Sequence, residues 1–432
     1  MLRSNGLRRN RALTCSAMPA QAARQNRHEG DKVRITRITT LQADGGWRTI
    51  SFLKLETDAG LVGWSEYSES ICSRGLTGVI GAVGALAVGR DPRAFARLAA
   101  ELGAASRAVS GGLAQQAIAA ITNACIDVGG KAAGIPAYRL FGGPYRDRIP
   151  LYWSHCGTFR AIRPDIFETV IGTPPLRQMG DFAALGREVR ERGFTALKTN
   201  PVIFSGEGAA MRNPGFIPSP TYDFAGANRD FPRAAIEAQV EALRAGAGVN
   251  VDIMLDLNFS LSGDGMLRVG RLLDGLGLAW LEIDALHPAA LAELRTRIAT
   301  PIASGEALHG LHQYRPFIEA RAADVVLIDA VWNGVHEAVR IATLAEAHQT
   351  NVAPHNCFGN LATLMSAHFA AAVPNVRIME IEMDDVAWHA DFVTRPPRIE
   401  AGSLILDEAP GWGADIDEEA VRAHPVPGAR SA

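Results

Sequence analysis

Three short apolar segments of the chain each end in a carboxylate: Ile253-Met-Leu-Asp256-Leu-Asn258, Trp280-Leu-Glu282-Ile-Asp284 and Ile302-Ala-Ser-Gly-Glu306-Ala307. The three carboxylates are 26 and 24 residues apart, which is the length of one strand followed by one helix. Successive parallel strands of a barrel present their carboxyl ends at one rim. The spacing therefore predicts that these side chains meet at the mouth of a barrel.

The same rhythm extends outward from these segments over about 235 residues. Short apolar strands alternate with helix-length amphipathic segments, which is the pattern of a TIM-type α/β barrel. A doubly wound sheet is the alternative, but no glycine-rich phosphate loop follows the first strand. The expected strands are 149–153, 196–199, 251–257, 279–283, 301–304, 325–328, 351–353 and 377–381.

The region before the barrel has a different pattern. Strand-like segments at 33–42, 49–57 and 61–65 precede helical segments at 75–89, 92–102 and 113–133. We expect an α+β domain over residues 31–145, the barrel over 146–385 and a C-terminal segment over 386–432. Residues 1–30 hold six arginines and are interpreted as a disordered tail, with a targeting segment as the alternative. The Gly/Pro-rich stretch 201–232 is either a loop that covers the site or reaches a neighbouring subunit, or a disordered segment.

Composition excludes several classes of protein. The 432 residues carry a formal charge of −3, so no basic face for nucleic acid is indicated. No apolar run reaches the length of a membrane span. The five cysteines contain no CxxC pair and read as reduced thiols of a cytoplasmic protein.

Three carboxylates at one rim repel each other unless a cation lies between them. All-oxygen ligation favours a hard ion, and Mg²⁺ suits a site of few carboxylates. We therefore predict Asp256, Glu282 and Glu306 as metal ligands. The alternative is that each carboxylate only caps the helix that follows it.

A second pair of polar residues ends two later strands. Asp329 in Leu-Ile-Asp-Ala-Val and His355 in Ala-Pro-His-Asn-Cys are 26 residues apart, so they should be neighbours on the same rim. An aspartate beside a histidine fixes its tautomer and raises its basicity. The pair is a candidate general base.

Together these residues make the chain similar to the enolase superfamily, specifically its mandelate racemase-like subgroup (the mandelate racemase/muconate lactonizing enzyme family). The resemblance covers roughly residues 33–425 and includes the carboxylate series, the Asp329–His355 pair and the Gly130-Lys131-Ala132 stretch. It implies a (β/α)7β barrel under an α+β capping domain to which the chain's end returns. It also implies Mg²⁺ on Asp256, Glu282 and Glu306, abstraction of the proton α to a carboxylate, and an enediolate stabilised by the ion.

Details at other strand ends bear on the reaction type. The segment Lys198-Thr-Asn200 lacks the second lysine of the family's Lys-x-Lys, which favours an acid-sugar dehydratase that gives a 2-keto-3-deoxy acid. Asn258 stands where galactonate dehydratases carry a histidine, so that substrate is not indicated. The alternatives are an epimerase, racemase or cycloisomerase on the same metal site, or a barrel without catalytic activity.

The remaining candidates are side chains near the expected site. Lys198 supplies positive charge, and Glu380, or Glu382 if the register slips by two, corresponds to the acid that the resemblance places against the enediolate. The general acid is His355 itself, His155, Tyr152 or His309. Substrate contacts are expected from Asn200, Asn258, His155, Trp47, Tyr67 and His309, and the resemblance implies a homo-oligomer, possibly an octamer, acting on a small carboxylate.

Overall fold

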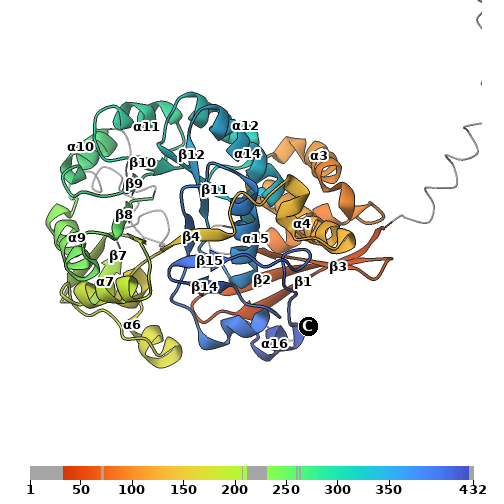
Figure 1. Cartoon of the computed structure of the whole chain (residues 1–432), viewed down its shortest axis with the longest axis horizontal. Helices are drawn as coiled ribbons and strands as arrows, with labels where there is room; N and C mark the ends of the chain where they lie inside the picture. Colours follow the sequence, from red (N-terminus) through yellow and green to blue (C-terminus); the bar gives the residue numbers. More distant parts are fainter. Residues whose placement is uncertain are drawn as a thin grey trace, which may run out of the picture.

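The computed structural model describes residues 33–69, 73–206, 208–211, 231–258, 261 and 264–427. The arginine-rich tail expected over residues 1–30 lies outside this range. Figure 1 shows a barrel beside a smaller part in red and orange, with the blue C-terminal segment lying across the smaller part.

Eight parallel strands among the described residues form the barrel. Seven of them pair in the order β12-β11-β10-β9-β8-β5-β4, and β13 pairs with β4 on the other side. A bridge between Val352 and Val376 closes the ring between β12 and the segment before β13. The strands are β4 Arg148–Trp153, β5 Ala196–Thr199, β8 Asp252–Asp256, β9 Trp280–Glu282, β10 Ile302–Ser304, β11 Val325–Asp329, β12 Asn351–His355 and β13 Met379–Ile381.

Helical segments fill the seven connections between these strands, which confirms the predicted (β/α)7β barrel. Each longer helix turns one apolar face inward, as in α7, where Phe182, Leu185 and Val189 are buried. The helical segments are α5 Thr158–Ile162, α6 Pro164–Ile166, η5 Phe167–Ile171, α7 Asp181–Glu191, α9 Arg233–Ala247, α10 Asp264–Leu273, α11 Pro288–Arg295, α12 Gly310–Glu319, α13 Ala330–Asn333, α14 Val335–Ala347 and α15 Asn360–Ala372.

The smaller part is the predicted α+β cap. Strands β1 (Ile35–Asp44), β2 (Thr49–Thr57) and β3 (Val62–Tyr67) form an antiparallel meander against α4 (Gly112–Ala133). A Cβ on Gly63 would lie 2.1 Å from the carbonyl oxygen of Ala124, so only glycine permits this close approach of β3 to α4. The remaining cap helices are α2 Leu76–Gly84, η2 Pro92–Ala94, α3 Phe95–Ala105, η3 Arg107–Val109 and η4 Ala137–Phe141.

The C-terminal segment returns to the cap, as predicted. The backbone N–H of Asp44 donates to the carbonyl of His424, and the Lys54 ammonium lies 2.5 Å from the Glu418 carboxylate. The segment contains η6 Ala387–Phe392, β14 Arg398–Glu400, β15 Ser403–Ile405 and α16 Glu418–Ala423.

The long connection after β5 differs from the prediction. Residues expected to begin a loop form a hairpin of β6 (Val202–Ser205) and β7 (Gly208–Met211). The two strands are only four residues each, and the surrounding glycines and prolines indicate a loop. Residues 212–230, the rest of the predicted loop, lie outside the described part.

Two further expectations concern the chain as a whole. The cysteines that the structure describes, Cys125, Cys156 and Cys357, are all free thiols. Among the described helices, none combines the length and the apolar character that crossing a bilayer requires.

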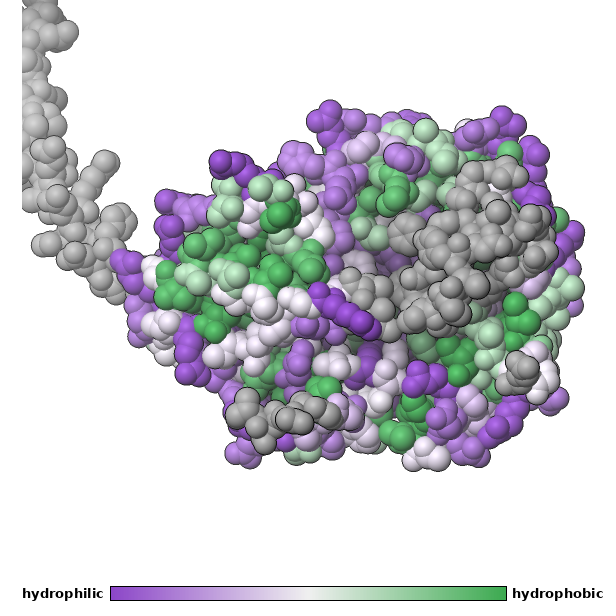
Figure 2. All heavy atoms as spheres, turned by 180° about the vertical axis from the view of Figure 1, so that it is seen from behind, coloured by the Kyte–Doolittle hydropathy of each residue, from purple (hydrophilic) through white to green (hydrophobic). Residues whose placement is uncertain are grey.

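Apolar residues also reach the surface of the cap. Figure 2 shows hydrophobic side chains gathered on one side of the reverse face. Among the described residues of the cap, the large exposed apolar side chains include Leu86, Val88 and Val109. Homo-oligomerisation stays a prediction.

Buried His368 should make folding stability depend on pH. Its Nδ1 accepts the N–H of Tyr138, and burial lowers its pKa to about 4. The folded state therefore resists protonation of His368. Its contribution to the free energy of unfolding is fully present above the unfolded pKa of about 6.5 and is lost as pH falls toward 4. We expect a loss of about 3 kcal/mol across that window. The free energy of unfolding, measured with urea at pH 7.0 and 4.5, should depend less on pH in His368→Gln, whose amide oxygen can still accept the Tyr138 N–H. A pH dependence equal to that of the wild type would contradict this role of His368.

Candidate active site

The three predicted metal ligands lie side by side at the carboxyl ends of adjacent strands. Asp256 ends β8 and pairs in register with Glu282 at the end of β9, while Glu306 lies two residues beyond β10. All three are almost completely buried, with exposed fractions of 3%, 0% and 3%. The strand spacing seen in the sequence therefore does bring these carboxylates together.

Lys198 is the ammonium group among these carboxylates. From β5, its Nζ lies 3.0 Å from both oxygens of Glu282, 2.9 Å from Glu380 and 3.9 Å from Asp256. Although burial alone lowers the pKa of Lys198, the surrounding carboxylates raise it well above its usual value. Lys198 is therefore held as a cation.

Lys198 does not fully offset the repulsion among these buried acids. Burial, with repulsion from neighbouring acids, raises the pKa of Glu282 and of Glu306 well above the ordinary value, despite the opposing effects of Lys198 and His355. Buried acids with raised pKa values are typical of sites that bind a cation or do proton chemistry.

The donor set fits Mg²⁺. Three carboxylates from adjacent strands supply hard oxygen ligands at one rim and carry charge that a divalent cation would neutralise. Within the described residues no three Asp, Glu, His or Cys side chains stand in a ligating arrangement, and both oxygens of Glu282 lie 3.0 Å from Lys198 Nζ. The fit thus rests on ligand chemistry and strand position.

Asp329 and His355 form the expected hydrogen-bonded pair. Their strands pair in register, and His355 Nδ1 lies 2.7 Å from Asp329 Oδ2. The other oxygen of Asp329 accepts the N–H groups of Val331 and Trp332 at the start of α13, which fixes the carboxylate. His355 Nε2 faces the site, 3.3 Å from Glu306.

This surrounding charge makes the imidazole basic. Burial alone lowers the pKa of His355, but Glu306, Cys357, Glu380 and the hydrogen bond to Asp329 raise it well above its usual value. The structure therefore places a strongly basic histidine beside the carboxylate cluster.

Glu380, not Glu382, is the acid of β13 that reaches the cluster. It contacts Lys198, accepts a hydrogen bond from Ser154 and lies 3.9 Å from His355 Nε2. Burial raises its pKa, but Lys198 and His355 together bring it below the ordinary value, so Glu380 is ionised. Glu382 instead lies 2.9 Å from His155 Nδ1.

The two asparagines lie beside the first carboxylate. Asn200 Nδ2 donates to the Asp256 carboxylate at 3.1 Å, while its Oδ1 accepts from Thr158. The backbone N–H of Asn258 donates to Asp256 Oδ1 at 2.8 Å, and Asn258 has a φ of 44°. Both residues orient Asp256 in this structure. His155 has the same left-handed φ of 44°, a strained conformation that often marks functional sites.

The expected contacts from the cap and from other strands are placed differently. Trp47 packs on Phe159 with ring centroids 4.5 Å apart, and Phe159 in turn packs on His155, which brings Trp47 toward the site. His309 stacks on Trp332 and hydrogen-bonds to Gln116. Tyr152 is fully buried in the barrel interior, where Lys198 Nζ lies 5.5 Å from its ring centroid.

The expectation for Tyr67 requires correction. Tyr67 is 2% exposed, belongs to the apolar core of the cap and hydrogen-bonds to Thr77. Successive side chains of a strand point to opposite faces, so Glu66, rather than Tyr67, points toward the barrel. Tyr67 therefore does not reach the site.

Several residues near the site were not predicted. Asp284, two residues after Glu282, is fully buried, and burial and Asp256 raise its pKa to about 6. A second acidic residue two positions after Glu282 is the sequence signal that could have indicated Asp284. Arg48, Trp332 and Phe358 had no local signal: Arg48 donates to the carbonyl of Cys357, and the two aromatic rings lie 5.4 Å and 5.6 Å from the His355 ring.

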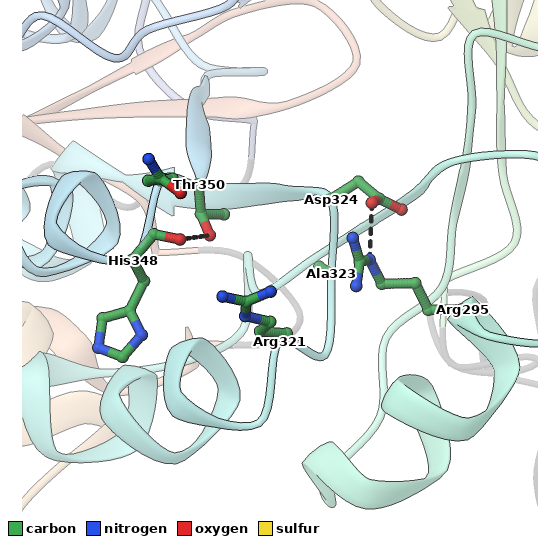
Figure 3. Close-up of a pocket in the computed structure, with 7 residues that line it drawn as sticks. Arg295, Arg321, Ala323, Asp324, His348 and Thr350 are labelled. Atoms are coloured by element: carbon green, nitrogen blue, oxygen red, sulfur yellow. Dashed lines mark hydrogen bonds and ion pairs between the residues drawn. The ribbon is translucent and has the colours of Figure 1, made fainter.

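A separate pocket lies at the opposite end of the barrel. It has a volume of about 190 Å³ and lies near the amino ends of β11 and β12 (Figure 3). Arg295 is paired with Asp324 there, at 2.6 Å. In TIM barrels chemistry occurs at the carboxyl ends of strands, so this pocket is not the active site.

Comparison with known proteins agrees with this geometry. The family described as enolase C-terminal domain-like matches residues 181–420, and the mandelate racemase / muconate lactonizing enzyme N-terminal domain matches residues 27–142. A solved structure from Burkholderia xenovorans, named as an L-alanine-DL-glutamate epimerase bound to magnesium and fumarate, superposes with a TM-score of 0.85. It is 41% identical in sequence, over 91% of this chain and 96% of that one.

Curated relatives carry dehydratase names. A D-xylonate dehydratase from Haloferax volcanii is 30% identical over 91% of this chain and 89% of its own length. A D-galactonate dehydratase from Ralstonia nicotianae is 28% identical over 90% and 94%. The expectation of a hydro-lyase agrees with these names. Both domains are matched by these families, and the carboxylates and the Asp329–His355 pair lie at the barrel rim. The chain therefore belongs to the enolase superfamily, in its mandelate racemase/muconate lactonizing enzyme group.

Proposed function

We propose that the chain is a Mg²⁺-dependent dehydratase of a sugar acid, an aldonate or aldarate. The observation that carries this is the position of His355, whose Nδ1 lies 2.7 Å from Asp329 and whose Nε2 lies 3.3 Å from Glu306, one of the three buried carboxylates. The dehydratase names of relatives that cover nine-tenths of the chain support the same reaction class.

Asp256, Glu282 and Glu306 would hold the ion. Bound Mg²⁺ would act as a Lewis acid on the substrate carboxylate and make its α-proton easier to remove. His355 Nε2 takes this proton, while Asp329 keeps Nδ1 protonated and orients the ring. Lys198 supplies fixed positive charge where negative charge develops on the substrate carboxylate.

Elimination follows on the same face of the substrate. The Cα–H electron pair forms the new double bond, and the Cβ–O bond breaks as His355 returns a proton to the leaving hydroxyl. One water is lost, and the resulting enol tautomerises to a 2-keto-3-deoxy acid. Of the other candidates for the general acid, Tyr152 is buried in the barrel interior, and His155 Nδ1 is within hydrogen-bonding distance of Glu382.

Epimerisation is the second candidate, because the Burkholderia xenovorans structure carries an epimerase name. It requires a second base on the opposite face of the α-carbon. The candidates for this base are Lys198, whose Nζ contacts Glu282 and Glu380, and His155, whose Nδ1 lies 2.9 Å from Glu382. The geometry therefore favours dehydration.

A substrate screen distinguishes the two reactions. Aldonic and aldaric acids incubated with the enzyme and Mg²⁺ in D₂O, followed by NMR, should yield a 2-keto-3-deoxy acid from at least one compound. Deuterium exchange at the α-carbon with isomerised product and no loss of water would contradict dehydration and establish the epimerase. Absence of turnover across the library would contradict a sugar-acid substrate.

A further inference from the structure

The segment that follows His355 is anchored from both domains. The Asn356 N–H donates to Glu380 Oε2 at 3.0 Å, which is a contact within the barrel. The Cys357 carbonyl accepts from Arg48, and the Gly359 N–H donates to Glu66 Oε1 at 2.5 Å. The residues immediately after the base are therefore held partly by the cap.

Glu66 makes the most specific of these contacts. Its second oxygen accepts the N–H of Ala362 at 3.0 Å, so one carboxylate binds two amides at the start of α15. A helix start with free N–H groups and its positive dipole end suits a carboxylate. The fit is tight, because a Cβ on Gly359 would lie 2.6 Å from both Glu66 oxygens.

The segment that follows His355 offers a second constraint on the imidazole beyond Asp329. Asp329 fixes Nδ1, but the direction of Nε2 also depends on the backbone that follows the ring. Phe358, between the two cap-bound residues Cys357 and Gly359, packs edge-on against His355 at 5.6 Å. A shift of this segment would therefore move the ring's neighbours directly, and small displacements of a catalytic group are costly.

We propose that Glu66 of the cap is a positioning residue for His355, acting through Gly359 and the 356–359 segment with Arg48 as a second anchor. The consequence for turnover rests on the proposed function, whereas the consequence for the ring and the backbone does not. Docking of the cap thereby sets the geometry of the base in the barrel.

The test uses the full chain with Mg²⁺ and perturbs the contact from both sides. Glu66→Gln removes one acceptor oxygen at nearly constant shape, and Gly359→Ala places a Cβ against the carboxylate. Lys54→Met is the matched control, because it breaks a cap contact to Glu418 away from this segment. Three measurements are made: amide hydrogen exchange of the 356–362 peptide, the His355 ring resonance assigned by its loss in His355→Asn, and kcat and KM.

Both variants should speed exchange in the 356–362 peptide at least roughly tenfold and shift or broaden the His355 resonance. They should lower kcat by roughly 10- to 100-fold and change KM and Mg²⁺ affinity less than about twofold, because the metal ligands belong to the barrel. Lys54→Met should leave all of these values unchanged.

Two results would overturn the proposal. Unchanged exchange at 356–362 in both variants would show that Glu66 does not hold the segment. Faster exchange with an unmoved His355 resonance would show that Glu66 has only a structural role. If one variant fails to fold, the other decides, and if no sugar acid is turned over, exchange and the ring resonance still decide while the proposed function alone fails.

Discussion

His355→Asn is expected to reduce dehydration by roughly 10³- to 10⁴-fold, the range that a general acid–base group contributes. The amide cannot accept the α-proton at the position of Nε2, and in syn elimination the same atom returns the proton to the leaving hydroxyl. Both halves of the reaction therefore depend on one side chain.

Turnover of the substrate found by the NMR screen measures this effect, and calorimetry with Mg²⁺ shows whether the metal site survives. Mg²⁺ affinity should stay near the wild-type value because none of the three predicted ligands is changed. His312→Asn, at an exposed position within α12, is the matched control and should be fully active. Turnover near the wild-type rate in His355→Asn would contradict the assignment of the base.

Glu282→Gln is expected to weaken Mg²⁺ binding at least roughly 100-fold and to abolish turnover. A neutral amide is a poorer ligand for a hard cation than a carboxylate. Glu282 is the central carboxylate, paired in register with Asp256 and fully buried.

Isothermal calorimetry measures the affinity, and turnover is followed before and after removal of divalent ions with EDTA. Wild-type activity should disappear with EDTA and return with Mg²⁺, whereas Glu282→Gln should remain inactive at ordinary concentrations. Glu319→Gln removes the same charge from an exposed Arg315 pair and should change neither value. Wild-type affinity in Glu282→Gln would remove this residue from the ligand set.

The barrel and the meeting of these polar side chains at its rim could be predicted because their determinants are local and periodic. Strand β5 was predicted over the residues that it occupies, and β11 and β12 extend beyond the predicted ends to include Asp329 and His355. Parallel strands at regular spacing bring their last residues to one rim, so spacing along the chain becomes proximity in space.

Contacts between distant segments could not be predicted in this way. Lys198 is visible in the sequence, but its pairing with Glu282 and Glu380 depends on the closure of the barrel. The hairpin of β6 and β7 was missed because the Gly/Pro-rich surroundings suggest a loop. Arg48 and Trp332 carry no local signal of a site.

Residues 66 and 67 show most clearly which features follow from the local sequence and which follow from the packing of the two domains. The sequence by itself determined that strand β3 exists and that its side chains alternate between two faces, because alternation is a property of the extended backbone. Only the tertiary structure decided which face meets the barrel, with Tyr67 in the cap core and Glu66 against Gly359, 293 residues away. The physical reason is that the choice depends on the packing of two domains, and local spacing carries no information about that packing.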